Sequence, residues 1–123
     1  MKLLLDTHAI LWWLGRDAQL SKHARGAIED AGTEAAVSVV SIWEASIKTA
    51  TGRLRGPELR PWVEKAGLPF LHIDERHAQL AGALPLHHRD PFDRMLVAQA
   101  MREGLTLVTA DRHIAKYDVK VIW

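Results

Sequence analysis

Short apolar runs alternate with longer amphipathic stretches along this chain of 123 residues. Residues 2–5 form a continuous apolar run, which is typical of a strand buried on both faces. Similar short runs predict strands over 35–39, 70–73 and 105–109, and an edge strand over 119–122. The stretches between them predict helices over 7–14, 21–31, 41–52, 58–66, 74–84 and 90–103, and a short helix that begins at Asp111.

Polar residues mark the expected helix starts. Ser41 followed by Glu44 fits a capping box, in which the glutamate reaches back to the capping residue. Asp90-Pro91 fits an N-cap followed by proline at the first helical position. Gly56-Pro57 is expected to separate two helices. The alternation of strands and helices predicts one α/β domain over residues 1–123, with a mostly parallel sheet of four to five strands.

Composition narrows the class of protein. Hydrophobic residues make up 48% and charged residues 25%, near the globular average, which argues against disorder. No apolar run approaches the roughly 18 residues of a membrane span, and Asp6 comes too early for a signal peptide, so we expect a cytoplasmic protein without a membrane partner. There is no cysteine, and the net charge of +1 does not by itself indicate a nucleic-acid binder.

Four acidic residues follow or flank the predicted strands. Asp6 comes directly after a strand and Asp111 follows another within two residues. Glu44 lies one turn into a helix, and Asp93 lies in the first turn of another. Ligands of parallel α/β folds bind at the carboxyl ends of the strands, so these acids are expected at one sheet edge. Each also has a structural interpretation, because Asp caps helices well and acids are favoured in a first turn.

Asp93 is hardest to explain as a helix cap. It shares a helical face with Leu96, Val97 and Ala100, where an unpaired charge is costly. Asp90 explains the cap better, which leaves Asp93 available for another role.

The predicted cluster of carboxylates points to a bound cation, because like charges at a buried edge repel unless a cation neutralises them. Oxygen ligands without cysteine favour a hard ion, Mg²⁺ or Mn²⁺, which keeps waters suited to hydrolysis. The chain has no Gly-rich phosphate loop, dinucleotide fingerprint or Gly-x-Ser-x-Gly elbow. His87-His88 suggests zinc only weakly, since adjacent histidines usually point apart.

Four ordered blocks carry a family resemblance. Leu3–His8, Ser41–Glu44, His88–Arg94 and Leu107–Asp111 together resemble the PIN-domain nucleases, most of all the VapC toxins of toxin–antitoxin pairs. The resemblance implies a three-layer α/β/α fold and an endoribonuclease dependent on Mg²⁺ or Mn²⁺. It also implies an RNA substrate, a homodimer and a cognate VapB-like antitoxin whose tail covers the acidic pocket.

The resemblance further implies roles for individual residues. Asp6 and Asp93 match the metal-holding aspartates, and Glu44 and Asp111 match the acids that complete the metal shell or orient the water. Supporting groups and contacts with RNA phosphates are expected from Thr7, Thr109 and Asp90, and from Arg89, Arg94 and Arg112, respectively.

Three alternatives remain open at this stage. A catalytically silent PIN-like module would bind RNA or a protein without cutting it. A receiver-type signalling domain would need a well-placed lysine after a late strand, and a DNA flap nuclease would need room for a helical arch. The apolar helix that carries Trp12 and Trp13 is expected to pack in the core, with an interface as the alternative.

Overall fold

The computed structural model describes residues 1–56 and 58–123, so the predicted break at Gly56-Pro57 lies partly outside the described residues. The elements in chain order are β1 (Lys2–Leu5), α1 (Thr7–Leu14), α2 (Lys22–Glu29), β2 (Glu34–Ser38), α3 (Val39–Ala50), α4 (Leu59–Lys65), β3 (Phe70–Leu71), α5 (Glu75–Ala83), α6 (Pro91–Glu103), β4 (Thr106–Val108), the 3₁₀ helix η1 (Ile114–Lys116) and β5 (Val121–Ile122). None of the helices described is long and apolar enough to cross a membrane.

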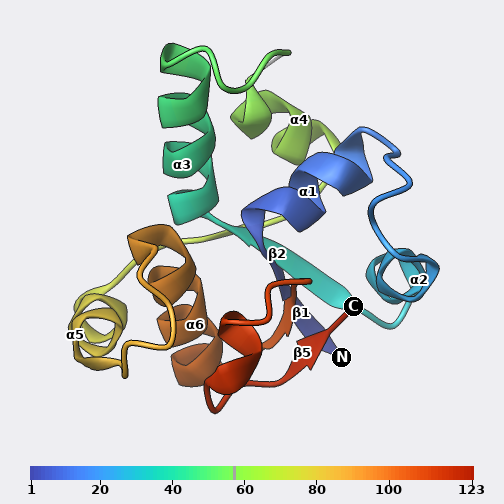
Figure 1. The fold of residues 1–123 in the computed structure, drawn as a ribbon. Coiled ribbons are helices and arrows are strands. Elements are labelled where there is room, and N and C mark those ends of the chain that lie inside the picture. Colours follow the sequence, from blue (N-terminus) through green and yellow to red (C-terminus); the bar gives the residue numbers. More distant parts are fainter. Residues whose placement is uncertain (57) are drawn as a thin grey trace.

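The strands of the described chain form a single five-stranded sheet in the order β3-β2-β1-β4-β5, as Figure 1 partly shows. Every pair of neighbouring strands is parallel. The predicted parallel α/β fold is therefore confirmed, and β1 is the central strand. The order reverses direction around β1, so the carboxyl ends of β1 and β4 mark the place where such folds bind ligands.

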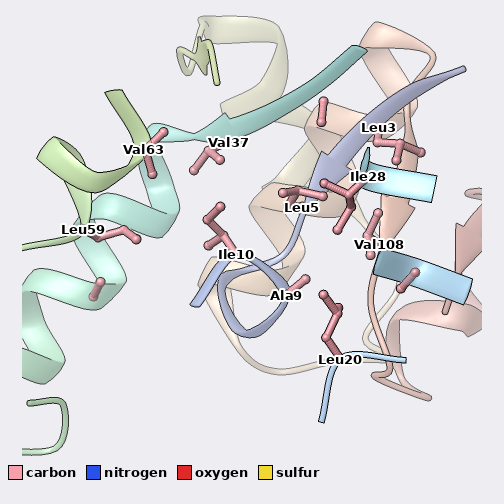
Figure 2. Close-up of a cluster of buried hydrophobic side chains, with 13 residues drawn as sticks. Leu3, Leu5, Ala9, Ile10, Leu20, Ile28, Val37, Leu59, Val63 and Val108 are labelled. Carbon is pink, nitrogen blue, oxygen red and sulfur yellow. The ribbon is translucent and has the colours of Figure 1, made fainter. Parts of the chain in front are cut away.

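Successive residues of a strand point to opposite faces of the sheet, so β1 contributes apolar side chains to both. Helices cover both faces. Leu3 and Leu5 of β1 pack with Ile10 of α1, Ile28 of α2 and Val63 of α4 (Figure 2). Leu4 and Leu107 point to the other face, in a cluster that includes α6 residues such as Leu96. All three leucines of β1 are fully buried. This arrangement is the expected three-layer α/β/α fold.

The third helix begins earlier than the sequence predicts. Ser38, not Ser41, is its N-cap, and the Ser38 hydroxyl accepts a hydrogen bond from the backbone N–H of Val40. The apolar β-branched pair Val39-Val40 resembles strand sequence, but this cap places it in the first turn of α3. The proposed Ser41–Glu44 capping box is therefore wrong, since Glu44 lies in the second turn of the helix.

Other predicted ends are close to those observed. Ser21, Asp74 and Asp90 cap α2, α5 and α6. The other three strands are shorter than expected, while β1 and β2 have the expected length: β3 ends at Leu71, β4 spans Thr106–Val108 and β5 begins at Val121. The predicted helix at Asp111 is a single 3₁₀ turn that begins at Ile114.

A buried polar contact joins the two helices that carry Glu44 and Asp93. The Ser38 hydroxyl, at the start of α3, donates a 2.5 Å hydrogen bond to the amide oxygen of Gln99 in α6. The Gln99 amide nitrogen donates to the backbone carbonyl of His72. Ser38 and Gln99 are both fully buried, so each polar atom lost here would leave its partner without a bond.

We expect Gln99→Leu to lower the free energy of unfolding by about 1–3 kcal/mol, because it leaves the Ser38 hydroxyl and the His72 carbonyl unsatisfied. Urea denaturation followed by circular dichroism measures the change. The exposed Gln79 of α5 provides the matched control, Gln79→Leu, with an expected effect within about 0.5 kcal/mol. Equal effects in the two variants would contradict a stabilising role for the buried contact.

Candidate active site

The four predicted acids come together at the carboxyl edge of the sheet. Asp6 directly follows β1, Glu44 is in α3, Asp93 is in α6, and Asp111 follows β4 by three residues. All four line one pocket of about 300 Å³. The remaining residues of its lining are Thr7, His8, Trp12, Lys48, Asp90, Ala110 and Trp123.

Asp6 is buried in this site, and hydrogen bonds fix its carboxylate. Its carboxylate caps α1 by accepting a 2.7 Å hydrogen bond from the N–H of Ala9. The Thr109 side chain also hydrogen-bonds to it, and the Thr109 hydroxyl accepts from the N–H of Asp111. Burial raises the pKa of Asp6 in spite of these hydrogen bonds, because the charged form loses its hydration. The predicted capping role is therefore real, and it coexists with a place in the pocket.

Glu44 is a buried carboxylate that is only half paired. Its Oε2 lies 3.2 Å from the Nζ of Lys48, one helical turn further along α3. Its Oε1 is buried and has no hydrogen-bond partner among the described residues. A buried carboxylate oxygen without a partner is costly, which makes this atom a candidate ligand or proton acceptor.

Asp90 and Asp93 have different roles at the start of α6. Asp90 caps the helix, since its Oδ1 accepts hydrogen bonds from the N–H groups of Phe92 and Asp93. Asp93 is therefore free of the cap, as its helical face predicts. Burial, together with the negative charges of Asp90, Glu44 and Asp6, raises the pKa of Asp93 to about 7. His88 opposes this rise but does not cancel it.

His88 joins two of the acids, a role that the sequence analysis missed. Its Nε2 lies 2.9 Å from Oδ2 of Asp111 and 3.1 Å from Oδ2 of Asp93. The N–H of Asp90 donates to Nδ1 of the same ring, which places the proton of the neutral ring on Nε2. Nε2 is then a donor to carboxylates and offers no lone pair to a metal, which argues against a zinc site here. His87 contacts the Tyr117 ring instead.

Asp111 differs from the other acids because it is well supplied with donors. Its Oδ1 accepts a 2.7 Å hydrogen bond from the N–H of His113, and its Oδ2 accepts from His88. Partial burial raises the pKa of Asp111, but these hydrogen bonds outweigh it and leave the pKa lowered. Asp111 is therefore an ionised carboxylate in a fixed orientation.

The residues predicted to support the acids or to contact RNA phosphates differ in how well the structure fits their predicted roles. Thr7 lines the pocket and its hydroxyl donates to Oγ of Ser41. Arg94 does not face the pocket as a free cation, because its guanidinium donates to the carbonyls of Ala81, Leu84 and Pro85. This geometry argues against the predicted phosphate contact from Arg94, since its donors already have partners. Arg89 and Arg112 are exposed, and their contact with RNA stays a prediction.

Lys48 and His88 had detectable signals in the sequence. Lys48 stands four residues after Glu44, a spacing that brings opposite charges together on a helix. His88 lies two residues before the Asp90 cap, close enough for its ring to turn back on the helix start.

A second group of ligand-type residues, Asp74, His77 and Glu103, lies between α5 and α6. Arg76 forms ion pairs with both acids of that group, so their negative charge already has a partner in the protein.

The raised pKa of Asp93 predicts a pH dependence of stability. Its folded-state pKa is about 7, above the roughly 4 of an unfolded chain, so the folded state holds the proton more tightly. In chelator-treated protein, stability should fall as pH rises from about 4 to about 7. Asp93→Asn should reduce this loss by about 2 kcal/mol or more, as measured by urea denaturation at pH 5 and pH 8.

The exposed Asp118 supplies the matched control. Asp118→Asn should follow the wild-type pH profile, while Asp93→Asn should flatten it. An Asp93→Asn profile parallel to the wild type would show that Asp93 does not carry the shift.

Comparison with known proteins identifies the family of this chain. Residues 3–120 match the family model of the PIN domain. Ribonuclease VapC22 of Mycobacterium tuberculosis is 32% identical over 119 residues, which cover 94% of this chain and 91% of the relative.

Solved structures share the fold at low sequence identity. VapBC2 from Rickettsia felis, bound to a promoter DNA fragment, aligns with a TM-score of 0.71 and 13% identity, and covers 99% of this chain and 98% of that one. A toxin–antitoxin complex from Klebsiella pneumoniae gives a TM-score of 0.69 and 20% identity over 98% and 96%. The family match over nearly the whole sequence and the 32% identical relative show that this chain belongs to the PIN-domain family.

Proposed function

We propose that this chain is a metal-dependent endoribonuclease and the toxin of a toxin–antitoxin pair, folded as one PIN-like nuclease domain over residues 1–123. The relative VapC22 is a ribonuclease, and several structural neighbours are toxin–antitoxin complexes. The single observation that carries the proposal is the pocket in which Asp6, Glu44, Asp93 and Asp111 converge from four parts of the chain.

The donor set of this pocket fits a hard divalent ion. Its acids offer oxygen ligands, and one of them, Oε1 of Glu44, is buried without a partner among the described residues. Asp6 and Asp93 would hold Mg²⁺ or Mn²⁺, since burial and neighbouring negative charge disfavour their ionised forms without a cation. When bound, such an ion lowers the pKa of a water molecule and stabilises negative charge on a phosphate.

The protein's own groups divide the remaining tasks. Both oxygens of Asp111 already accept hydrogen bonds, so this residue serves best to orient a water. Glu44 has one oxygen fixed by Lys48 and one free, which suits it to accept the proton of the attacking water. His88 positions Asp93 and Asp111, because one donor atom faces both carboxylates.

The partners follow from the same relatives. We propose RNA as the substrate and a cognate VapB-like antitoxin as the inhibitor, because structural neighbours such as VapBC-5 of Mycobacterium tuberculosis are toxin–antitoxin systems. Arg89 and Arg112 remain candidates for phosphate contacts beside the pocket. The homodimer and the cytoplasmic location stay predictions.

Replacing either metal-holding aspartate tests the proposal. Asp6→Asn and Asp93→Asn should each lower RNA cleavage on the order of 10³-fold, because the loss of ion binding removes several kcal/mol of transition-state stabilisation. The measurement is cleavage of total RNA by purified protein with Mg²⁺, with Mn²⁺ and with chelator, beside growth arrest on expression. Asp118→Asn, an exposed change outside the pocket, is the control and should cleave as the wild type does.

Two results would overturn this proposal. Full cleavage by both Asn variants would mean that other residues hold the ion. A folded wild-type protein that binds RNA but never cleaves it with either ion would indicate the catalytically silent module instead.

A further inference from the structure

Part of the lining of the acidic pocket is aromatic. His8, Trp12 and Trp123 all line the cavity that holds the acids. The His8 and Trp12 rings stack with 5.3 Å between centroids and 12° between planes. Trp123 meets Trp12 edge to face at 5.7 Å. The three rings are therefore in contact, and His8, the exposed one, covers a face of Trp12. We call this cluster the aromatic wall.

The fold explains why these rings meet beside the acids. His8 and Trp12 are four residues apart on α1, so they lie on one helical face. Trp123 follows β5 directly, and β5 is parallel to β4, so its carboxyl end lies at the edge where Asp111 stands. Trp12 and Trp123 are half-buried: they pack against the core cluster of Figure 2 and also line the pocket. Core packing alone does not account for the pocket-lining surface.

The negative charge of the acids explains why RNA would need an uncharged contact such as this wall. Five carboxylates line the pocket beside one lysine, so an approaching phosphate meets net negative charge before any cation is bound. Stacking of a base on an aromatic ring is attractive whatever the charge of the pocket. A base inside a duplex has both faces covered, so only an unpaired base can stack in this way.

We propose that His8, Trp12 and Trp123 form a stacking site for one unpaired nucleobase next to the phosphate that is cut. This inference rests on the proposed ribonuclease function and assigns the contact with the base to three residues of this chain. The wall provides affinity and selects against duplex RNA, while the acids carry the chemistry.

Nuclear magnetic resonance of the full chain tests the site directly. Each of the five tryptophans carries one indole N–H group, and Trp→Phe variants would assign the signals of these groups. We would titrate the chelator-treated protein, which cannot cut RNA under the proposed function, with a single-stranded uridine hexanucleotide and with its abasic counterpart of the same length and charge. The base-bearing RNA should shift the signals of Trp12 and Trp123, and the abasic chain should leave both unchanged.

Variants give the energetic test. Trp12→Leu should raise the Kd for the hexanucleotide about 10-fold, as expected for the loss of one stacked base. His8→Ala, an exposed change that removes the outer ring, should raise it in the same direction if Trp12→Leu fails to fold. Trp62→Leu, at an exposed tryptophan of α4 outside the pocket, is the matched control and should bind as the wild type does.

The outcomes separate this site from the catalytic proposal. Equal shifts from both oligonucleotides, or wild-type affinity in Trp12→Leu and His8→Ala, would overturn the stacking site while metal-dependent cleavage stands. Base-dependent shifts in a protein that cleaves no RNA would support the stacking site as an RNA contact and overturn the nuclease.

Discussion

Electrostatic repulsion within one small pocket is the constraint around which this protein is built. Asp6, Glu44, Asp93 and Asp111 reach the same edge of the sheet from different elements. Burial, together with the negative charges of Asp90, Glu44 and Asp6, raises the pKa of Asp93 to about 7, where an ordinary aspartate would be fully ionised. A chain that maximised stability alone would place apolar groups here, so the arrangement favours a role that needs a cation.

The surrounding fold offsets this repulsion with contacts that fix each helix. The Ser38–Gln99 hydrogen bond ties α3 to α6 beneath the acids. The Arg94 guanidinium donates a hydrogen bond to the Pro85 carbonyl in the loop before α6. In the same loop, the N–H of His88 donates to the Tyr117 hydroxyl. Asp93 also lies in the first turn of α6, where the helix dipole favours negative charge. These contacts fix the elements that carry the acids.

How far the sequence predicts this structure depends on the range of the interaction concerned. The apolar run at 2–5 and the helical faces depend on local periodicity, so the central strand, the layers and the freedom of Asp93 from the cap could be predicted. The start of α3 could not, because Val39-Val40 suits a strand and the Ser38 cap is stabilised by a partner 61 residues away. The roles of His88 and Arg94 depend on which atoms their side chains reach. The sequence places the His88 ring near the Asp90 cap, but it does not show that the ring reaches Asp93 and Asp111.

The aromatic wall is a second feature that depends on the topology and that the sequence pattern does not predict. Trp12 belongs to an apolar helix, and the sequence favours core packing for it. Only the parallel pairing of β4 with β5 brings Trp123 to the same edge, and so places both rings beside the acids. Residues with a packing role can therefore also line a site, when the topology brings their exposed parts together.

The most direct test of the central claim is anomalous X-ray scattering from crystals of the protein grown with Mn²⁺. If the crowded carboxylates exist to hold a divalent ion, an anomalous peak should lie between Asp6 and Asp93. It should be absent from crystals of Asp93→Asn grown under the same conditions. A peak only at Asp74, His77 and Glu103, or no peak at the sheet edge in well-ordered crystals at saturating Mn²⁺, would contradict the account.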